Sequence, residues 1–326
     1  MGEPQTGQGL GEPAFDVQDR ALGQILAALR GAGYTFTTPT PATHARVNAR
    51  PGAAQARDLR GVFGWSRPFE PTLLPGDLLR LLREADALDE TGPLPRSRIR
   101  VSSLDGDLFV HSAYPTDATD AVFFGPDTYR FALALRSALR GLETPVRRAV
   151  DIGCGAGPGG IVVAKACPQA QVVMGDINDA ALRYARVNAA AAGLANAAAC
   201  RSDLLTNVNG PLDLIVSNPP YLNDPLARAY RHGGGAFGAG LSVRILHAAL
   251  DRLEPGGALV LYTGSAIVDG RDTFLDEVRD RLERGDVEWR HGELDPDVFG
   301  EELETEAYRD AERIAAVLLV ATKKGV

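Results

Sequence analysis

The sequence has little of what metal sites and disulfide-bonded proteins need. Only three cysteines occur, Cys154, Cys167 and Cys200, and they show neither metal-ligand spacing nor the even number that a disulfide framework requires. The five histidines are scattered and show no ligand spacing. We therefore expect no metal site and a reducing, cytoplasmic compartment.

An excess of positive charge, a long apolar run and a basic leader are also missing. The net charge is -8 and the sequence pI is about 5.2, so no global basic field attracts nucleic acid or an anionic membrane. No run reaches transmembrane length, and the first residues include neither a basic segment nor an apolar one. We expect no membrane partner. The length of 326 residues, 45% of them hydrophobic, suits one large domain and a smaller one.

The most informative stretch runs from Asp213 to Tyr221 and reads Asp-Leu-Ile-Val-Ser-Asn-Pro-Pro-Tyr. Its apolar run predicts a strand that is covered on both faces. Pro219 and Pro220 cannot continue a sheet ladder, so the chain leaves the sheet at Asn218. A turn that merely ends a strand is the alternative interpretation of these residues taken alone.

The groups at this strand end suit a planar NH2 donor. Asn218 offers a side-chain carbonyl, Pro219 a backbone carbonyl, and Tyr221 a flat ring. An amide or amine can donate both hydrogens to these acceptors while its plane stacks on the ring. The nitrogen lone pair is then free to attack an electrophile.

A glycine-rich turn lies upstream, within Ala149-Val-Asp-Ile-Gly-Cys-Gly-Ala-Gly-Pro-Gly-Gly160. Gly153, Gly155 and Gly157 permit close approach of backbone to a ligand where a helix begins. A dinucleotide-binding fold is the alternative, but its pattern is Gly-x-Gly-x-x-Gly. Here Asp151 precedes the glycines, and a carboxylate there repels a pyrophosphate but pairs with an ammonium group.

Two further apolar runs end in acidic residues. The first run ends at Asp176, near the distance at which an acid meets ribose hydroxyls in nucleotide-binding α/β folds. The second ends at Ser202-Asp203-Leu204, where a carboxylate is suitably placed for an adenine edge. The sequence therefore predicts several strands that end beside one nucleoside.

With these motifs in order, the region from about Phe123 to Val326 resembles the class I S-adenosylmethionine-dependent methyltransferases. Within that superfamily, the Asp176 to Ala189 segment and the Asn-Pro-Pro-Tyr loop look like the release-factor glutamine (HemK-like) and adenine-N6 amino-methyltransferases. The resemblance implies S-adenosyl-L-methionine as cofactor. It assigns the cofactor to Phe124, Pro126, Asp151, Gly153, Gly155, Gly157, Asp176, Ile177, Asp203, Leu204 and Asn218, and the NH2 group being methylated to Asn218, Pro219, Pro220 and Tyr221.

The expected fold class is α/β, a doubly wound and mostly parallel sheet of seven strands whose last strand is antiparallel. We expect a disordered tail over 1–14, a small α+β recognition domain over 15–115 and the methyltransferase domain over 116–326. Helical periodicity covers Val17 to Leu29 and Leu73 to Ala87, and Asp105-Gly106 predicts a hairpin. A winged helix is one candidate for the small domain. The release-factor enzymes instead carry an all-helical domain there.

Three segments bear on the partner. Five arginines against one acid give residues 42–67 a local charge of +4, which suits either a solvated face or a nucleic-acid surface. Nine acids lie between Glu293 and Glu312, and we expect a solvated crossover between the last two strands. The glycine-rich segment from Leu222 to Gly240 predicts a mobile lid.

The motifs leave the methyl acceptor open between two macromolecules. A protein carboxamide, on a partner such as a translation factor, agrees with the motif context and with the acidic balance. An adenine N6 or cytosine N4 in DNA or RNA agrees with the helix-plus-hairpin domain and the arginines. A binding protein without chemistry is the third possibility, and its signature would be a missing motif residue, which this chain does not show.

Overall fold

The computed structural model describes residues 15–224, 228 and 230–325. The predicted disordered tail, 1–14, therefore lies outside the described residues, as do four positions of the predicted lid. Within the described part, no helix combines the length and the apolar character that a membrane span requires.

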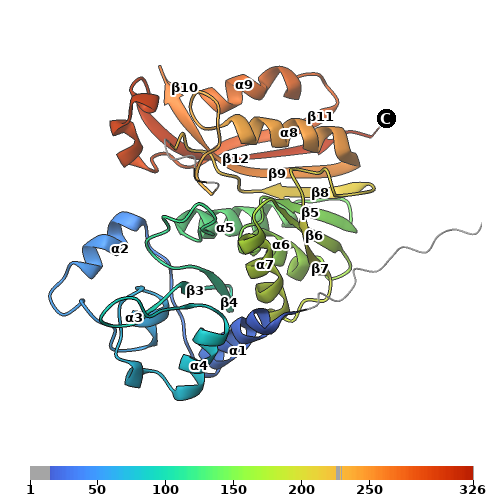
Figure 1. Ribbon diagram of the computed structural model, residues 1–326. Helices are drawn as coiled ribbons and strands as arrows, with labels where there is room; N and C mark the ends of the chain where they lie inside the picture. The colour runs from blue at the N-terminus through green and yellow to red at the C-terminus, as the bar shows by residue number, and fades with distance from the viewer. Residues whose placement is uncertain (1–14, 225–227, 229, 326) are drawn as a thin grey trace, which may run out of the picture.

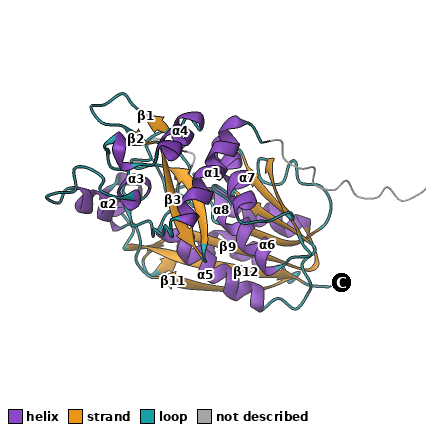
Figure 2. Ribbon diagram, turned by 90° about the horizontal axis from the view of Figure 1, so that it is seen from below, coloured by secondary structure: helices purple, strands orange, loops and turns teal. Residues whose placement is uncertain are grey.

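The N-terminal elements form two antiparallel strand pairs surrounded by helices (Figure 2). In chain order they are α1 (Val17–Gly31), α2 (Pro41–Asn48), α3 (Leu59–Phe63), η1 (Pro71–Leu73), α4 (Gly76–Glu84), β1 (Leu88–Asp89), β2 (Arg96–Ser97), β3 (Ile99–Leu104) and β4 (Asp107–Ser112). The predicted hairpin is confirmed, because β3 pairs with β4 through a turn at Asp105 and Gly106, both with positive φ. The predicted helix over Leu73 to Ala87 is shorter than expected, since Pro75 stands at its N-cap.

The remaining elements build one large sheet with helices on both faces. They are α5 (Pro126–Arg140), β5 (Arg148–Ile152), α6 (Pro158–Ala166), β6 (Gln171–Asp176), α7 (Asp179–Ala191), β7 (Ala197–Arg201), β8 (Leu212–Ser217), α8 (Gly240–Arg252), β9 (Leu253–Val268), β10 (Arg271–Asp272), α9 (Thr273–Leu282), β11 (Val287–Asp295), η2 (Gly300–Glu304), η3 (Glu306–Tyr308) and β12 (Arg313–Lys323).

The sheet has the predicted order of a doubly wound fold. Seven strands run β11-β12-β9-β8-β5-β6-β7, and β10 pairs with the end of β9. The five central strands are parallel, whereas β12 is antiparallel to both of its neighbours. The α/β prediction with an antiparallel last strand is thus confirmed.

Side chains alternate between the two faces of the sheet along each strand, so each face forms its own hydrophobic core. On β5, Ala149 faces the layer of α5, α6 and α7, while Val150 and Ile152 face α8 and α9. Figure 1 shows these helix layers below and above the sheet. Because both faces are covered, the central strands carry nearly continuous apolar runs, as parallel strands usually do.

Helix α7 joins the N-terminal elements to the sheet. Its buried Asn188 bonds to both the N–H and the C=O of Val110 on β4, at 2.8 and 3.0 Å, and its amide also donates to the Ala156 carbonyl. One side chain therefore links the hairpin to the glycine-rich turn. Val187 adds an apolar contact with the N-terminal core.

Candidate functional site

A cavity of about 450 Å³ lies at the carboxyl ends of four parallel strands. This is where ligands bind in open α/β sheets. The residues that follow each strand line it: Gly153 and Gly155 after β5, Asp176 and Ile177 at the end of β6, Asp203 and Leu204 after β7, and Asn218, Pro219, Pro220 and Tyr221 after β8. Ten of the residues predicted to form the site are therefore brought together.

The glycine turn has the open backbone that a close ligand requires. Gly153 has φ +67°, and a Cβ atom placed on it would meet no atom within 4 Å. The N–H groups of Gly153 and Cys154 both donate to the Gly175 carbonyl, at 2.8 and 3.0 Å. These bonds hold the turn against β6 and leave the Gly153 Cα beside the cavity.

Four predicted cofactor residues do not line the cavity. Gly157 packs inward, since a Cβ there would come within 3.0 Å of the Met174 sulfur. Asp151 is 2% exposed, and its Oδ2 accepts a bond from Gly160 N at 2.8 Å. Burial raises the pKa of this carboxyl to about 7. Both residues lie beneath the turn, and their predicted contact with the cofactor stays a prediction.

The other two residues are Phe124, which lies just before α5, and Pro126, which begins it. Phe124 is 1% exposed and stacks on His111 of the N-terminal part, with ring centroids 5.1 Å apart. Pro126 also does not line the cavity, whereas Phe123, Asp127 and Thr128 do. The sequence identified the right segment but not the side chains that face inward, since it carries no signal for the direction of a loop.

Asp176 and Asp203 present different carboxylates. The two oxygens of Asp176 accept bonds from Gly155 N and Asn178 N, each at 2.9 Å. Its pKa is raised because burial opposes the charged form. Asp203 is exposed, and its Oδ1 lies 3.6 Å from the guanidinium of Arg244, which also lines the cavity.

The end of β8 is held by a side-chain hydrogen bond of Ser217, whereas the side-chain amide of the next residue, Asn218, is not held in this way. The Ser217 hydroxyl donates to the Ile152 carbonyl at 2.7 Å and ties β8 to β5. No side-chain bond joins Asn218 to another residue that the structure describes, and Asn218 is half-buried in the cavity wall. Its amide is therefore available to a ligand.

Tyr221 is held by packing alone. Its hydroxyl is buried without a hydrogen-bond partner among the described residues. The ring meets Phe299 edge-on, with centroids 5.9 Å apart, and lies 6.3 Å from Tyr262. A Cβ on Gly264 would come within 2.3 Å of the ring, so glycine on β9 makes room for it.

Sequence reasoning missed a carboxylate close to Tyr221. Asp127, in the first turn of α5, lines the cavity although it is only 7% exposed. Its Oδ1 accepts the Tyr262 hydroxyl at 2.7 Å and Arg130 Nη1 at 3.2 Å. Burial raises its pKa, and the neighbouring Tyr262, Arg130 and Tyr221 oppose that rise. The sequence offered no signal, because Tyr262 and Tyr221 lie far from Asp127 along the chain.

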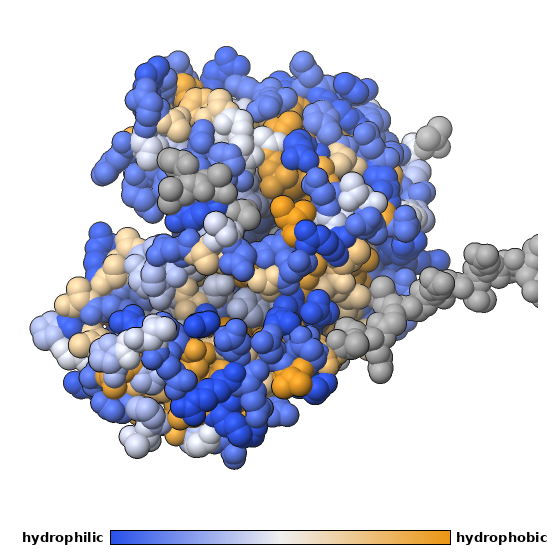
Figure 3. All heavy atoms as spheres, viewed as in Figure 1, coloured by the Kyte–Doolittle hydropathy of each residue, from blue (hydrophilic) through white to orange (hydrophobic). Residues whose placement is uncertain are grey.

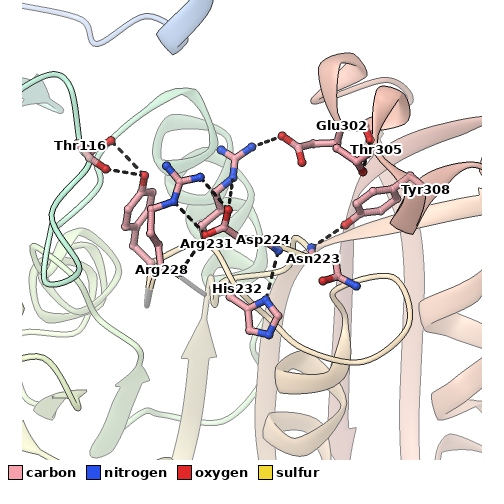
Figure 4. Close-up of polar contacts among 10 residues, drawn as sticks. Thr116, Asn223, Asp224, Arg228, Arg231, His232, Glu302, Thr305 and Tyr308 are labelled. Carbon is pink, nitrogen blue, oxygen red and sulfur yellow. Dashed lines mark hydrogen bonds and ion pairs between the residues drawn. The ribbon is translucent and has the colours of Figure 1, made fainter. Parts of the chain in front are cut away.

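Described residues after Tyr221 line the cavity and bond to two distant parts of the chain (Figure 4). A turn in this segment is closed by Leu222 N donating to the Arg231 carbonyl at 3.0 Å. On one side the Tyr230 hydroxyl donates to the Thr116 carbonyl at 2.8 Å. On the other, Asn223 N donates to the Tyr308 hydroxyl at 2.9 Å.

Ion pairs reinforce the same segment. Asp224 is buried and bonds to the guanidinium of Arg228, which lowers the pKa of this carboxyl to about 2. Arg231 contacts Glu302 of the β11–β12 crossover. The crossover is the connection predicted over Glu293 to Glu312, but Phe299 lines the cavity and Tyr308 is buried, so it is only partly solvated.

No group of three or more His, Cys, Asp or Glu suited to a metal ion occurs in the part of the chain that the structure describes. The acids of the cavity instead lie apart: Asp176 and Asp203 at separate strand ends, and Asp127 in the first turn of α5. They therefore offer single hydrogen-bond acceptors along an elongated ligand.

Comparison with known proteins gives a family. The methyltransferase small domain matches residues 134–268. The release factor glutamine methyltransferase of Bradyrhizobium diazoefficiens is 34% identical over 236 residues, which cover 67% of this chain and 78% of that protein. The corresponding enzyme of Deinococcus radiodurans is 34% identical over 179 residues, 51% of this chain, and the chain spans only 62% of its length.

A relative with a different name aligns over more of the chain. The 4-amino-L-phenylalanine/4-methylamino-L-phenylalanine methyltransferase of Streptomyces pristinaespiralis is 28% identical over 275 residues. The alignment covers 76% of this chain and 82% of that protein. It extends beyond the 135 residues of the matching domain.

Proposed function

Because this chain belongs to the class I S-adenosylmethionine-dependent methyltransferases, we propose that it methylates a planar NH2 group at the end of β8. The observation that carries the proposal is the half-buried Asn218 amide, which faces the cavity without a side-chain partner among the described residues. An amide without such a partner at a strand end can hydrogen-bond to a ligand, and it does not stabilise the fold through a side-chain bond.

The cavity fits S-adenosylmethionine. Gly153 leaves room for close approach, Asp176 offers a carboxylate for ribose hydroxyls, and Asp203 with Leu204 offers an edge for adenine. The buried Asp151 then supports the turn from below, in place of the direct contact with the methionine moiety that the resemblance implies. When bound, the cofactor supplies an electrophilic methyl group on its sulfonium.

The residues after β8 orient the acceptor. The Asn218 side-chain carbonyl and the Pro219 carbonyl accept the two hydrogens of the NH2 group, and Tyr221 covers its plane. Orientation of this kind lowers the activation free energy by up to about 7–11 kcal/mol in well-aligned reactions. The two acceptors also stabilise the positive charge that develops on the nitrogen. Asp127 holds Tyr262 beside the Tyr221 ring.

We propose a glutamine carboxamide of a protein as the first acceptor. Two of the relatives are named glutamine methyltransferases. The third is named for 4-amino-L-phenylalanine, which carries an additional amino group on its aromatic ring. The acidic crossover at the cavity suits a neutral or basic segment. A base amine of a nucleic acid is the second candidate, and the arginines of residues 42–67 are the observation that favours it.

One labelling experiment tests the acceptor. The chain is incubated with methyl-labelled S-adenosylmethionine and a methylase-deficient lysate, which is then divided between protease and nuclease. Label that protease removes supports the carboxamide, and label that nuclease removes supports the base amine. The Asn218→Ala chain is the control, and equal labelling by it would contradict the assigned site. Label found only in the small-molecule fraction would contradict a macromolecular acceptor.

A further inference from the structure

Five arginines within residues 42–67 lack the ion pairs that most other surface arginines have. We name them the arginine surface: Arg46, Arg50, Arg57, Arg60 and Arg67. Four are exposed and Arg67 is half-buried. No salt bridge joins any of them to a carboxylate within residues 15–224, 228 and 230–325. By contrast, Arg80 pairs with Glu84 at 2.6 Å and Arg83 with Glu90 at 2.7 Å.

The one acid in this region is used by the fold. The Asp58 carboxylate caps α3 by accepting a bond from Gly61 N at 2.7 Å. A helix cap of this kind keeps the carboxylate at the helix end rather than on the guanidinium groups. The local positive charge is therefore left for a ligand or for solvent.

Two guanidinium groups are held in place by aromatic rings. Arg67 lies 5.6 Å from the Trp65 ring centroid and donates from Nε to Asn48 Oδ1 at 2.8 Å. Arg60 lies 5.7 Å from the Phe36 centroid. Stacked guanidinium groups lose less conformational freedom when they bind an anion. Burial lowers the pKa of Arg67, the Asp58 carboxylate opposes that shift, and the nearby Arg57 adds to it.

The arginine surface begins at the cavity. Helix α2 starts at Pro41, which lines the cavity, and Arg46 follows within about two turns. The acidic crossover borders the cavity from the other side, through Phe299. In the view of Figure 3 the molecule is hollowed between the N-terminal elements below and the β10–β12 region above. Pro41 thus connects the cavity to the helix that carries Arg46, and Phe299 connects it to the acidic crossover.

We propose that the arginine surface binds the phosphodiester backbone of a single-stranded nucleic acid. Arginine matches phosphate with paired N–H donors. Strand binding here would favour the base amine, the second acceptor candidate, which a pocket reaches only in a single strand. The acidic crossover repels phosphate, so the strand lies along α2 and α3.

An acidic protein fits this surface less well. Stable protein interfaces have an apolar centre. The exposed large hydrophobic residues of the described chain are Val17, Leu133, Ile177 and Leu294, and none lies within residues 41–67. Trp65 is only partly exposed there, and its ring is flanked by Arg67, His44 and Phe36.

The inference rests on the proposed function only for the position of the acceptor site, so it is tested by binding and without cofactor. Fluorescence anisotropy measures binding of the whole chain to labelled 20-nucleotide RNA and DNA strands between 50 and 200 mM salt, roughly the range over which phosphate contacts weaken. A variant replaces Arg46, Arg50, Arg57 and Arg60 with alanine and retains Arg67, which bonds to Asn48.

The variant should bind at least 10-fold more weakly at low salt. Its slope of log K against log salt should fall by about 3, since each lost phosphate contact contributes about 0.7 for single strands. A control variant replaces four ion-paired surface arginines with alanine: Arg80, Arg83, Arg279 and Arg309. This control removes the same number of arginines, and its affinity for the strands should fall less than 2-fold.

Three results would overturn the proposal: no binding by the parent chain, equal losses in both variants, or polyglutamate competing as well as unlabelled strand. Melting temperatures of both variants show whether each is folded. A preference for the RNA or the DNA arm identifies the source of the strand. Methyl transfer is measured separately, so failure of strand binding leaves the proposed function standing, and the reverse also holds.

Discussion

The two halves of the cavity are built in different ways. The half that we assign to the cofactor comes from the ends of β5, β6 and β7, within residues 151–204, and its polar contacts join neighbouring strands. The half that we assign to the acceptor combines Asp127, the residues after β8 and Phe299 of the crossover. The first half is local in sequence and fixed by backbone, whereas the second depends on contacts between distant segments. Substitutions should therefore act differently in the two halves.

The largest expected effect is in the acceptor half. Asn218→Ala should lower methyl transfer about 100-fold or more, which is typical when one preorganised polar group of an active site is removed. The fold should be retained, because Asn218 makes no side-chain bond that the described structure depends on. Turnover, cofactor affinity and melting temperature are measured side by side. Full activity would remove Asn218 from the site, and a matching loss of stability would assign it to the turn instead.

Asp176→Ala tests the cofactor half of the cavity. We expect cofactor affinity to fall by roughly 1.5–3 kcal/mol through loss of charge-assisted hydrogen bonds. Calorimetry with S-adenosylmethionine measures this, and Asp203→Ala is the comparison because that carboxylate is exposed. Unchanged affinity in Asp176→Ala would exclude the ribose role. Tighter binding of NADH than of S-adenosylmethionine would contradict the cofactor itself.

A third prediction concerns pH and the buried Asp151. Its folded pKa, about 7, lies above the ordinary value of 3.8, so the folded state holds a proton that the unfolded state releases. The cofactor-free chain should therefore lose stability as pH rises from about 4 to 7, on the order of 1–2 kcal/mol between pH 5 and pH 8. Asp151→Asn should flatten this slope while still accepting the bond from Gly160.

Denaturant titration at several pH values measures the slope. Asp213→Asn is the matched control, because Asp213 also accepts backbone N–H bonds, from Arg147 and Arg148, but lies at the other end of the sheet. It should retain the parent slope. A parent chain that gains stability between pH 5 and pH 8, with Asp151→Asn behaving identically, would show that the buried carboxyl does not titrate in this range.

The smallest effect is expected from Tyr221→Phe. The hydroxyl is buried without a hydrogen-bond partner among the described residues, so its removal should change the free energy of unfolding by less than about 1 kcal/mol. Tyr221→Ala should instead weaken acceptor binding, because the stacking ring is lost. A large loss of stability in the phenylalanine variant would reveal a bond between this hydroxyl and Asp127.

The cofactor half was predictable because its signals are short. The order of acids and glycines in Asp151, Gly153 and Asp176 indicates strand ends, and parallel strands bring their ends to one edge of a sheet. The sequence did not indicate that Gly157 packs toward Met174 or that Phe124 stacks on His111, because these contacts depend on tertiary packing. The α/β topology followed from the same alternation of strands and helices.

The acceptor half was less predictable because it depends on long-range contacts. The sequence identified the Asn218 to Tyr221 loop but gave no indication that Asp127 would lie beside it, 91 positions before Asn218. The composition of the crossover suggested a solvated face, and no local pattern indicated that Phe299 would line the cavity. We propose that the boundary near residue 115 separates two domains, although α7 packs against both sides of it.

The missing side chain at Gly264 constrains how the site can be redesigned. The Tyr221 ring occupies the volume that any larger residue on this part of β9 would need. Positions 221 and 264 therefore behave as one unit of fixed size, shared between a loop and a strand. An engineer who wants a bulkier acceptor has to shrink residue 221 and leave 264 empty. A larger residue at position 264 displaces the Tyr221 ring into the space that we assign to the acceptor.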